Sequence, residues 1–297
     1  MRTVTMKTSK IQMKIAMMAI MSILFITSCN NDDDNGNSQP NASRNEPQQV
    51  SIDLGTHKLE TYSQINDTEY LVVFESGLGY GAFEWFTTGI VDEIGDLSDV
   101  LLYDRAGYNN SEIGPSPRDI ETLTSDLEMV VEPYLNGRKM ILVCHSLGGL
   151  IARDYAIKNP DKVASILFID PTHESFHNLN QAKEDFVYEI YVGLFGTENH
   201  GAPMEARELI EDDIYATNFT DLPNIPITVL TSMKQDQNNN DTDELHEGTR
   251  QTWYDAHEEL GVGISDFTHI STVHSGHGIN FEEPSLVIAH IIILLSK

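Results

Sequence analysis

The sequence predicts an α/β protein with a mainly parallel, doubly wound sheet, and two observations support this prediction. Short apolar runs alternate with helix-like stretches from residue 50 onward. The runs are continuously apolar, which is typical of strands that helices cover on both faces. The chain has 297 residues, of which 40% are hydrophobic, so it is long enough to bury such a core.

The expected elements follow one another along the chain. Residues 50–65 alternate between apolar and polar side chains, which indicates an antiparallel hairpin. Apolar strands are expected at residues 70–74, 99–103, 139–144, 163–169 and 225–230, with a last strand at 267–273. Helices are expected at residues 83–95, 118–133, 147–158 and 284–295. The last helix is too short to span a bilayer, which needs about 20 apolar residues.

One long spacer, residues 171–224, interrupts the alternation of strands and helices. It contains two helix-like stretches, QAKEDFVYEIYVGLF at 181–195 and PMEARELIEDDIYATNF at 203–219. We therefore expect a helical cap inserted between two strands of the sheet.

Residues 1–28 have the composition of an export signal. Four basic residues precede an apolar run at residues 15–27, which is short for a membrane span. The run leads into the sequence ITSC, ending at Cys29, and this resembles a bacterial lipoprotein signal that is cleaved before a lipidated cysteine. The resemblance implies lipid attachment at Cys29. The alternative is a plain secretion signal with an incidental cysteine.

The residues behind the signal predict a tether. Residues 30–49 are polar and nearly devoid of apolar side chains, so they cannot offset the entropy of ordering. We interpret residues 29–49 as a flexible tether that joins a lipidated Cys29 to a domain at residues 50–297. The expected location is the bacterial cell envelope, at the outer membrane or cell surface, with the membrane as a partner through Cys29.

Composition excludes several classes of function. The chain has 18 basic and 46 acidic residues, a formal net charge of −28, whereas binding nucleic acid needs clustered Lys and Arg. Cys29 and Cys144 are the only cysteines, which excludes a disulfide framework and a zinc-type Cys/His spacing. The sequence HSGH at 274–277 lacks a nearby carboxylate or cysteine at fixed spacing, and no nucleotide or flavin fingerprint is present. We therefore expect neither a metal nor a cofactor.

A serine lies at the junction of a predicted strand and a predicted helix. It is Ser146, in the stretch VCHSLGG at residues 143–149. A sharp strand-to-helix turn needs small residues two before and two after a nucleophile, and these are Cys144 and Gly148. The pattern is therefore C-x-S-x-G, which departs from the usual G-x-S-x-G at Cys144. Because ligands bind at the carboxyl ends of parallel strands, Ser146 is a candidate nucleophile.

With these residues in view, the chain resembles the α/β-hydrolase family over about residues 50–297. FESGLGYG at 74–81 is similar to the family's oxyanion-hole segment. DRAGYNNS at 104–111 is similar to its D-x-x-G-x-G-x-S turn, with Asn109 in place of the second glycine. SGHGINFEEPSLVIAHI at 275–291 is similar to its histidine loop and final helix.

The resemblance implies roles for individual residues. It assigns the nucleophile to Ser146 and its general base to His277, with His274 as the alternative base. It assigns the oxyanion hole to the backbone N–H groups of Leu78 and Leu147.

The carboxylate that orients the base has two candidates. Asp170 follows the strand at 163–169, and Asp236 follows the strand at 225–230. Both strand ends serve this purpose in the family. Asp170 is favoured because its strand and Pro171 restrict its position, whereas Asp236 lies in a polar loop.

These features predict a serine hydrolase that acts on carboxylic esters or related acyl bonds. The partner would be a small-molecule acyl substrate, and the reaction would pass through an acyl-serine intermediate. The main alternative is a non-catalytic surface lipoprotein that binds a ligand on the same fold. A metal-dependent hydrolase is a further alternative. The substrate and the oligomeric state are not specified by the sequence.

Replacing Cys29 by alanine should prevent lipid attachment, because the thiol that would carry the acyl chains is removed. Labelling of expressing bacteria with a radioactive fatty acid checks this. We expect label in the wild-type protein and in the Cys144→Ala control, but none in Cys29→Ala. Equal labelling of all three proteins would contradict the anchor.

Overall fold

The computed structural model describes residues 47–176, 179–235 and 250–297. Within them, the strands form one eight-stranded sheet in the order β1-β2-β4-β3-β5-β6-β7-β8. Strands β3 to β8 pair in parallel, whereas β1 with β2 and β2 with β4 pair antiparallel. The predicted fold class is confirmed. The predicted signal, Cys29 and Asp236 lie outside the described residues.

The strands lie within two residues of their predicted positions. They are β1 (Gln48–Asp53), β2 (Lys58–Gln64), β3 (Leu71–Glu75), β4 (Asp99–Tyr103), β5 (Met140–His145), β6 (Val163–Ile169), β7 (Ile227–Ser232) and β8 (Phe267–Thr272). Strand β1 therefore begins two residues inside the predicted tether. The central strands β3, β4 and β5 are buried along their whole length. Their continuous apolar sequence is explained by this burial on both faces.

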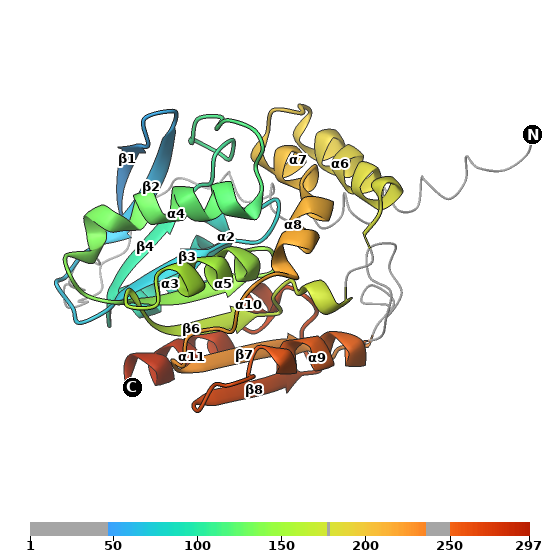
Figure 1. The fold of residues 1–297 in the computed structure, drawn as a ribbon. Helices are drawn as coiled ribbons and strands as arrows, with labels where there is room; N and C mark the ends of the chain where they lie inside the picture. Colours follow the sequence, from blue (N-terminus) through green and yellow to red (C-terminus); the bar gives the residue numbers. More distant parts are fainter. Residues whose placement is uncertain (1–46, 177–178, 236–249) are drawn as a thin grey trace, which may run out of the picture.

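Helices cover both faces of the sheet and create two hydrophobic cores (Figure 1). On one face, α4 (Ile120–Leu135) and α5 (Gly148–Lys158) pack against the strands. On the other face, α3 (Ile90–Gly95) and α11 (Pro284–Leu295) do so. Within the described residues, no helix combines the length and the apolar character needed to cross a membrane.

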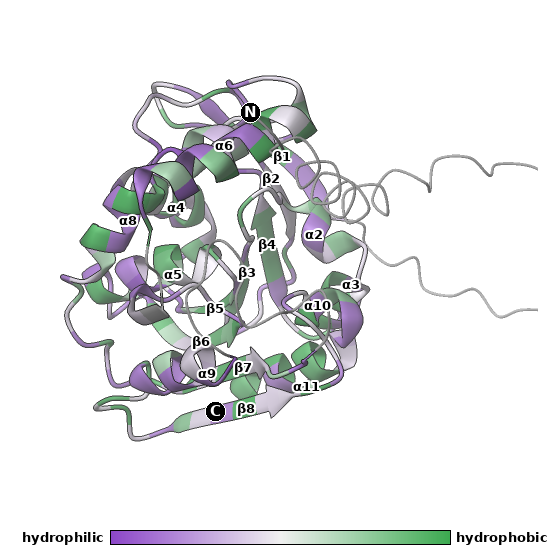
Figure 2. Cartoon of the chain, turned by 90° about the vertical axis from the view of Figure 1, so that its right-hand side faces the viewer, coloured by the Kyte–Doolittle hydropathy of each residue, from purple (hydrophilic) through white to green (hydrophobic). Residues whose placement is uncertain are grey.

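Within the described residues, the cap includes the α-helices α6 (Gln181–Phe195), α7 (Gly201–Ala206) and α8 (Leu209–Ala216), which lie between β6 and β7. They lie at the end of the sheet where the parallel strands terminate (Figure 1). Figure 2 shows that α6 and α8 mix hydrophobic and hydrophilic residues, whereas the buried strand β4 is hydrophobic. The cap is therefore amphipathic, as expected for helices with one packed side and one solvated side.

Two predicted helices are interrupted in the structure. The prediction of one helix at 83–95 is wrong, because Gly89 adopts a φ of +74° and separates α2 (Phe83–Phe86) from α3. The helix-like stretch at 203–219 is likewise divided between α7 and α8. At Gly89 the interruption follows from the left-handed conformation, which glycine adopts at little cost, whereas no residue between α7 and α8 has a positive φ.

Three further helical segments were not predicted. They are the short segments η1 (Glu174–Phe176) and α10 (Ile279–Glu282), and the longer helix α9 (Arg250–Glu259). The sequence of α9, RQTWYDAHEE, is mostly polar and has no continuous apolar stripe. Its buried side chains are Arg250, Trp253, Ala256 and His257. These residues face the functional site described next.

Candidate active site

Ser146 lies in the sharp turn between β5 and α5. Its φ is +52°, in the left-handed region where a non-glycine residue is strained. Its N–H donates to the carbonyl oxygen of Ile169 at 3.2 Å, and its own carbonyl oxygen accepts from the N–H of Thr172 at 2.9 Å. These bonds attach the turn to the end of β6. The geometry is that of a nucleophile elbow.

The residues on either side of Ser146 have little room. A side chain on Gly148 would begin 2.6 Å from the carbonyl oxygen of Glu75, so only glycine fits there. Cys144 is completely buried, and its Sγ lies 3.4 Å from the carbonyl oxygen of Leu167. The cysteine therefore fits the position that glycine usually holds. Burial raises the pKa of the Cys144 thiol well above its ordinary value, which keeps the thiol unreactive.

Three residues distant in sequence form a hydrogen-bonded series. The Oγ of Ser146 lies 2.9 Å from Nε2 of His277. The Nδ1 of His277 lies 2.7 Å from Oδ2 of Asp170, which follows β6 with a φ of +41°. The structure thus brings together Ser146, His277 and Asp170. The alternative base, His274, lies nearer the end of β8, where its N–H donates to Thr272.

One face of α9 packs against the acid and the base of this series. Nη2 of Arg250 contacts both carboxylate oxygens of Asp170, at 2.8 and 3.1 Å. Trp253 meets the ring of His277 nearly edge-on, with centroids 5.8 Å apart. His257 lies 2.7 Å from the carbonyl oxygen of Pro171 through Nε2. The positions i, i+3 and i+7 share one face of a helix, so α9 supplies all three contacts together. The i, i+3, i+7 spacing was the sequence signal for a buried face of α9. The signal is weak because one of the three residues, Arg250, is charged.

These surroundings set the charge states of the acid and the base. Burial disfavours a charged Asp170, but the hydrogen bond from His277 and the charge of Arg250 hold the pKa of Asp170 well below its usual range. Burial lowers the pKa of His277, and the charges of His145 and Arg250 act in the same direction, whereas the hydrogen bond and charge of Asp170 oppose them; the net shift is downward. The His277 side chain is 41% exposed, which moderates the effect of burial. Its neutral form is therefore favoured, and this is the form that can accept a proton.

A second buried pair, Glu84 and His145, lies beside the series. Oε1 of Glu84 is 2.5 Å from Nδ1 of His145, and Nε2 of His145 is 3.0 Å from the carbonyl oxygen of His277. Glu84 also accepts hydrogen bonds from the N–H of Gly77 at 3.0 Å and from the side chain of Asn280 at 2.9 Å. Burial disfavours both charges, yet Glu84 raises the pKa of His145 and His145 lowers the pKa of Glu84. The pair joins the loop after β3, the nucleophile turn and the histidine loop. Sequence reasoning missed both residues.

Two backbone N–H groups are available beside Ser146. Leu78 lies in the loop after β3, and Leu147 directly follows Ser146. Within the described residues, neither N–H donates to a protein acceptor. Leu147 is buried, and Leu78 is partly buried. They are the residues to which the sequence assigned an oxyanion hole.

In the part of the chain that the structure describes, no group of three or more His, Cys, Asp or Glu side chains is placed to hold a metal ion. Among these described residues, His274 and His277 do not form a metal pair with a carboxylate. The polar side chains of the site instead contact one another.

Comparison with known proteins supports the same architecture. A family model described as alpha/beta hydrolase fold matches residues 70–289. By sequence, the chain is 28% identical over 119 residues to the uncharacterized protein YbdG of Bacillus subtilis, and 31% identical over 109 residues to the (lyso)-N-acylphosphatidylethanolamine lipase of Homo sapiens. These segments cover 40% and 36% of this chain, and 36% and 31% of those proteins, so the chain spans about a third of their length.

A solved structure with a similar fold is a thermophilic esterase from Thermogutta terrifontis. The TM-score is 0.62 at 18% sequence identity, over 84% of this chain and 98% of the esterase chain. At this identity the similarity concerns the fold alone.

The imidazole of His277 should titrate below the ordinary histidine value of 6.5, because burial and two neighbouring positive charges disfavour the imidazolium more than Asp170 favours it. Replacing Arg250 by glutamine should raise this pKa, since one of those charges is removed while the carboxylate of Asp170 remains. NMR titration of histidine-labelled protein measures the pKa of His277 in the wild-type protein and in Arg250→Gln. The signal of His277 is identified as the one that is missing from His277→Gln. Arg207→Gln, which removes a surface arginine paired with Asp185, serves as the control. An Arg250→Gln protein with an unchanged His277 pKa would refute the electrostatic effect.

Proposed function

This chain belongs to the α/β hydrolase fold family, and we propose that it is a serine hydrolase acting on carboxylic esters or related acyl bonds. The observation that carries the proposal is the series from Ser146 Oγ through His277 to Asp170, at 2.9 and 2.7 Å. A serine hydroxyl is a weak nucleophile unless an adjacent base accepts its proton. The series supplies that base, together with a carboxylate that orients it.

The acylation step follows from these positions. Nε2 of His277 accepts the proton of Ser146 as Oγ attacks the carbonyl carbon of the substrate. The negative charge on the resulting oxyanion is stabilised by the N–H groups of Leu78 and Leu147. His277 then gives the proton to the leaving alcohol oxygen, the C–O bond breaks and an acyl-serine remains.

Deacylation repeats the sequence with water. His277 accepts a proton from a water molecule, whose oxygen attacks the acyl carbon. The bond to Oγ breaks, Ser146 regains its proton from His277 and the carboxylic acid is released. In both steps the carboxylate of Asp170 stabilises the transient imidazolium and holds the ring in the required tautomer.

The similar proteins include an esterase and a lipase, which agrees with this reaction class. The main alternative remains a non-catalytic, ligand-binding surface lipoprotein. The proposal also includes attachment to the bacterial envelope through Cys29, and this part rests on the sequence motif ITSC.

Ser146→Ala and His277→Ala should each lower the turnover of p-nitrophenyl esters by about 10⁴-fold or more, because the two side chains act as a unit. The double variant should lose little more than either single variant. Wild-type protein should also be labelled by a fluorophosphonate, and Ser146→Ala should not. Substantial turnover in either single variant would contradict the assignment of Ser146 as nucleophile and His277 as base. An unlabelled wild-type protein would favour the ligand-binding alternative. Activity abolished by a chelator would favour a metal-dependent hydrolase.

Asp170→Asn should lower turnover by about 10⁴-fold, because an amide favours the wrong tautomer of His277 and provides no counter-charge for the imidazolium. Asp236→Asn is the matched variant and should retain near-normal turnover. Circular dichroism should first show that both proteins are folded, since Asp170 is completely buried. The opposite pattern, in which only Asp236→Asn loses its turnover, would assign the acid to the strand end after β7.

A further inference from the structure

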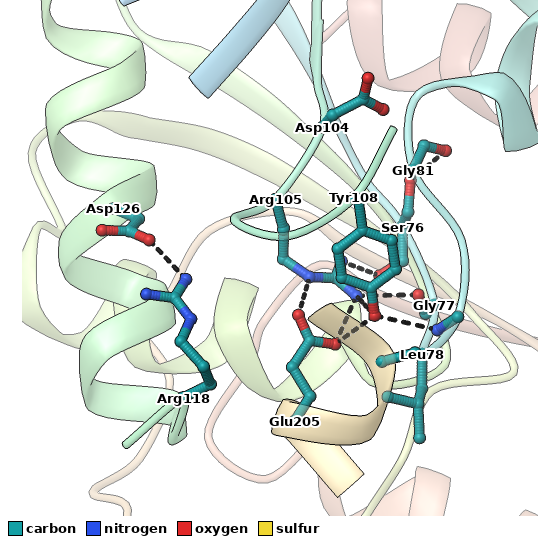
Figure 3. A network of polar contacts seen from close by, with 12 residues as sticks. Ser76, Gly77, Leu78, Gly81, Asp104, Arg105, Tyr108, Arg118, Asp126 and Glu205 are labelled. Atoms are coloured by element: carbon teal, nitrogen blue, oxygen red, sulfur yellow. Dashed lines mark hydrogen bonds and ion pairs between the residues drawn. The ribbon is translucent and has the colours of Figure 1, made fainter. Parts of the chain in front are cut away.

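Arg105 is a buried arginine whose five N–H hydrogens all have acceptors (Figure 3). Nε and Nη2 donate to the two carboxylate oxygens of Glu205, at 2.8 and 2.9 Å. Nη1 donates to Oε1 of Glu75 at 2.8 Å and to the carbonyl oxygen of Ser76 at 2.7 Å. Nη2 also donates to the carbonyl oxygen of Gly77 at 2.9 Å. Because every donor is satisfied, the position of the guanidinium group is closely restricted.

The hydrogen bond from Arg105 to the carbonyl oxygen of Gly77 also determines the direction of the N–H of Leu78. The carbonyl of Gly77 and the N–H of Leu78 belong to one peptide unit. A trans peptide is planar, so its N–H points opposite to its carbonyl. By holding the carbonyl of Gly77, Arg105 therefore holds the N–H of Leu78 in a defined direction. Within the described residues this N–H has no acceptor, whereas the neighbouring N–H groups of Gly77 and Gly79 each have one.

The other side of this network belongs to the cap. Glu205 lies on α7 and is completely buried. Besides Arg105, it accepts a hydrogen bond from the hydroxyl of Tyr108 at 2.6 Å, and that hydroxyl accepts from the N–H of Gly79 at 3.1 Å. On α6, the hydroxyl of Tyr191 donates to the carbonyl oxygen of Leu78 at 3.2 Å. The peptide units on both sides of Leu78 are thus held by side chains whose positions depend on the cap.

We propose that Arg105 and Glu205 are positioning residues that direct the N–H of Leu78 toward the oxyanion, so that the oxyanion hole is complete only when the cap is seated on the sheet. This inference rests on the proposed function, which gives the N–H of Leu78 its role. Neither residue touches the reacting atoms. Arg105 acts through the peptide of Gly77, and Glu205 acts through Arg105.

A nearby ion pair offers a matched control. Arg118 and Asp126 also form a buried arginine–carboxylate pair, with Nη2 and Oδ2 2.5 Å apart (Figure 3). In the described part of the chain, the hydrogen bonds of Asp126 go to Arg118 and His57, and neither Arg118 nor Asp126 is hydrogen-bonded to the loop after β3. Disrupting this pair should therefore affect stability without changing the direction of the Leu78 N–H.

The test compares Glu205→Gln with Asp126→Asn in the full chain. Complete loss of one oxyanion donor costs about 10²–10³-fold in kcat. For Glu205→Gln, which weakens the alignment without removing the donor, we expect a decrease of about 10-fold in kcat, with KM changed by less than about two-fold. Asp126→Asn should leave both constants within about two-fold of wild type, even where its melting temperature falls equally. Arg105→Lys retains the charge but cannot satisfy the same acceptors, so it should lose about 10²-fold in kcat.

Hydrogen exchange of residues 76–81 gives a readout that does not require turnover. We expect faster exchange of this segment in Glu205→Gln and Arg105→Lys than in wild type and Asp126→Asn. Equal kcat and equal exchange in Glu205→Gln and Asp126→Asn would overturn the positioning role. A wild-type protein without ester hydrolysis or fluorophosphonate labelling would instead overturn the proposed function, and the exchange comparison would then decide by itself whether the pair holds the loop. If Glu205→Gln does not fold, the same comparison is made with Arg105→Lys.

Discussion

The close fit of the turn after β5 between its two neighbouring strand ends constrains the whole site. A side chain on Gly148 would begin 2.6 Å from the carbonyl oxygen of Glu75, at the end of β3. One on Gly149 would begin 2.6 Å from Cβ of Pro171, just beyond β6. With no side chains at these positions, the turn brings the hydroxyl of Ser146 between the loop after β3 and the carboxylate after β6. The strained φ of Ser146 is maintained because the neighbouring strand ends hold the turn on both sides.

Buried charge around this turn is arranged in pairs. Glu84 with His145, Asp170 with Arg250, and Arg105 with Glu205 each join segments that are far apart in the sequence. Removing one member of such a pair would leave an uncompensated buried charge, which typically costs about 3–5 kcal/mol. Buried pairs contribute less to net stability than their strength in isolation implies, but they fix geometry. Here they hold the backbone of the histidine loop, the carboxylate of Asp170 and the peptide unit that carries the N–H of Leu78.

The cap contributes to the site as well as covering it. Glu205 and Tyr191 contact the network around the loop after β3, whereas the series from Ser146 to Asp170 is built entirely on the sheet and its loops. The series therefore belongs to the sheet and its loops, whereas part of the network that holds the loop after β3 belongs to the cap. A fold alone does not specify a substrate, so the specificity of the proposed hydrolase has to be sought in the cap helices rather than in the fold.

The sequence alone determined the order of the strands along the chain and most of their boundaries, because a strand buried on both faces must be continuously apolar. It also pointed to Ser146, His277 and Asp170 as candidates, since each lies next to a strand end or in a recognisable motif. It favoured Asp170 over Asp236 but kept Asp236 as an alternative. The boundary between α2 and α3 was missed, because the left-handed conformation of Gly89 is not apparent from an otherwise helical stretch.

Only the tertiary structure decided which distant groups meet. Arg250 lies 80 residues from Asp170, Arg105 lies 100 residues from Glu205, and Asn280 lies 196 residues from Glu84. Sequence periodicity reports on neighbours within one helix or strand, whereas a buried charged side chain can be recognised only together with its partner. The polar helix α9 therefore gave only a weak signal of burial, although its inner face contacts both Asp170 and His277. The physical reason is that apolar burial leaves a local pattern in the sequence, while the pairing of buried charges depends on contacts that form only in the folded chain.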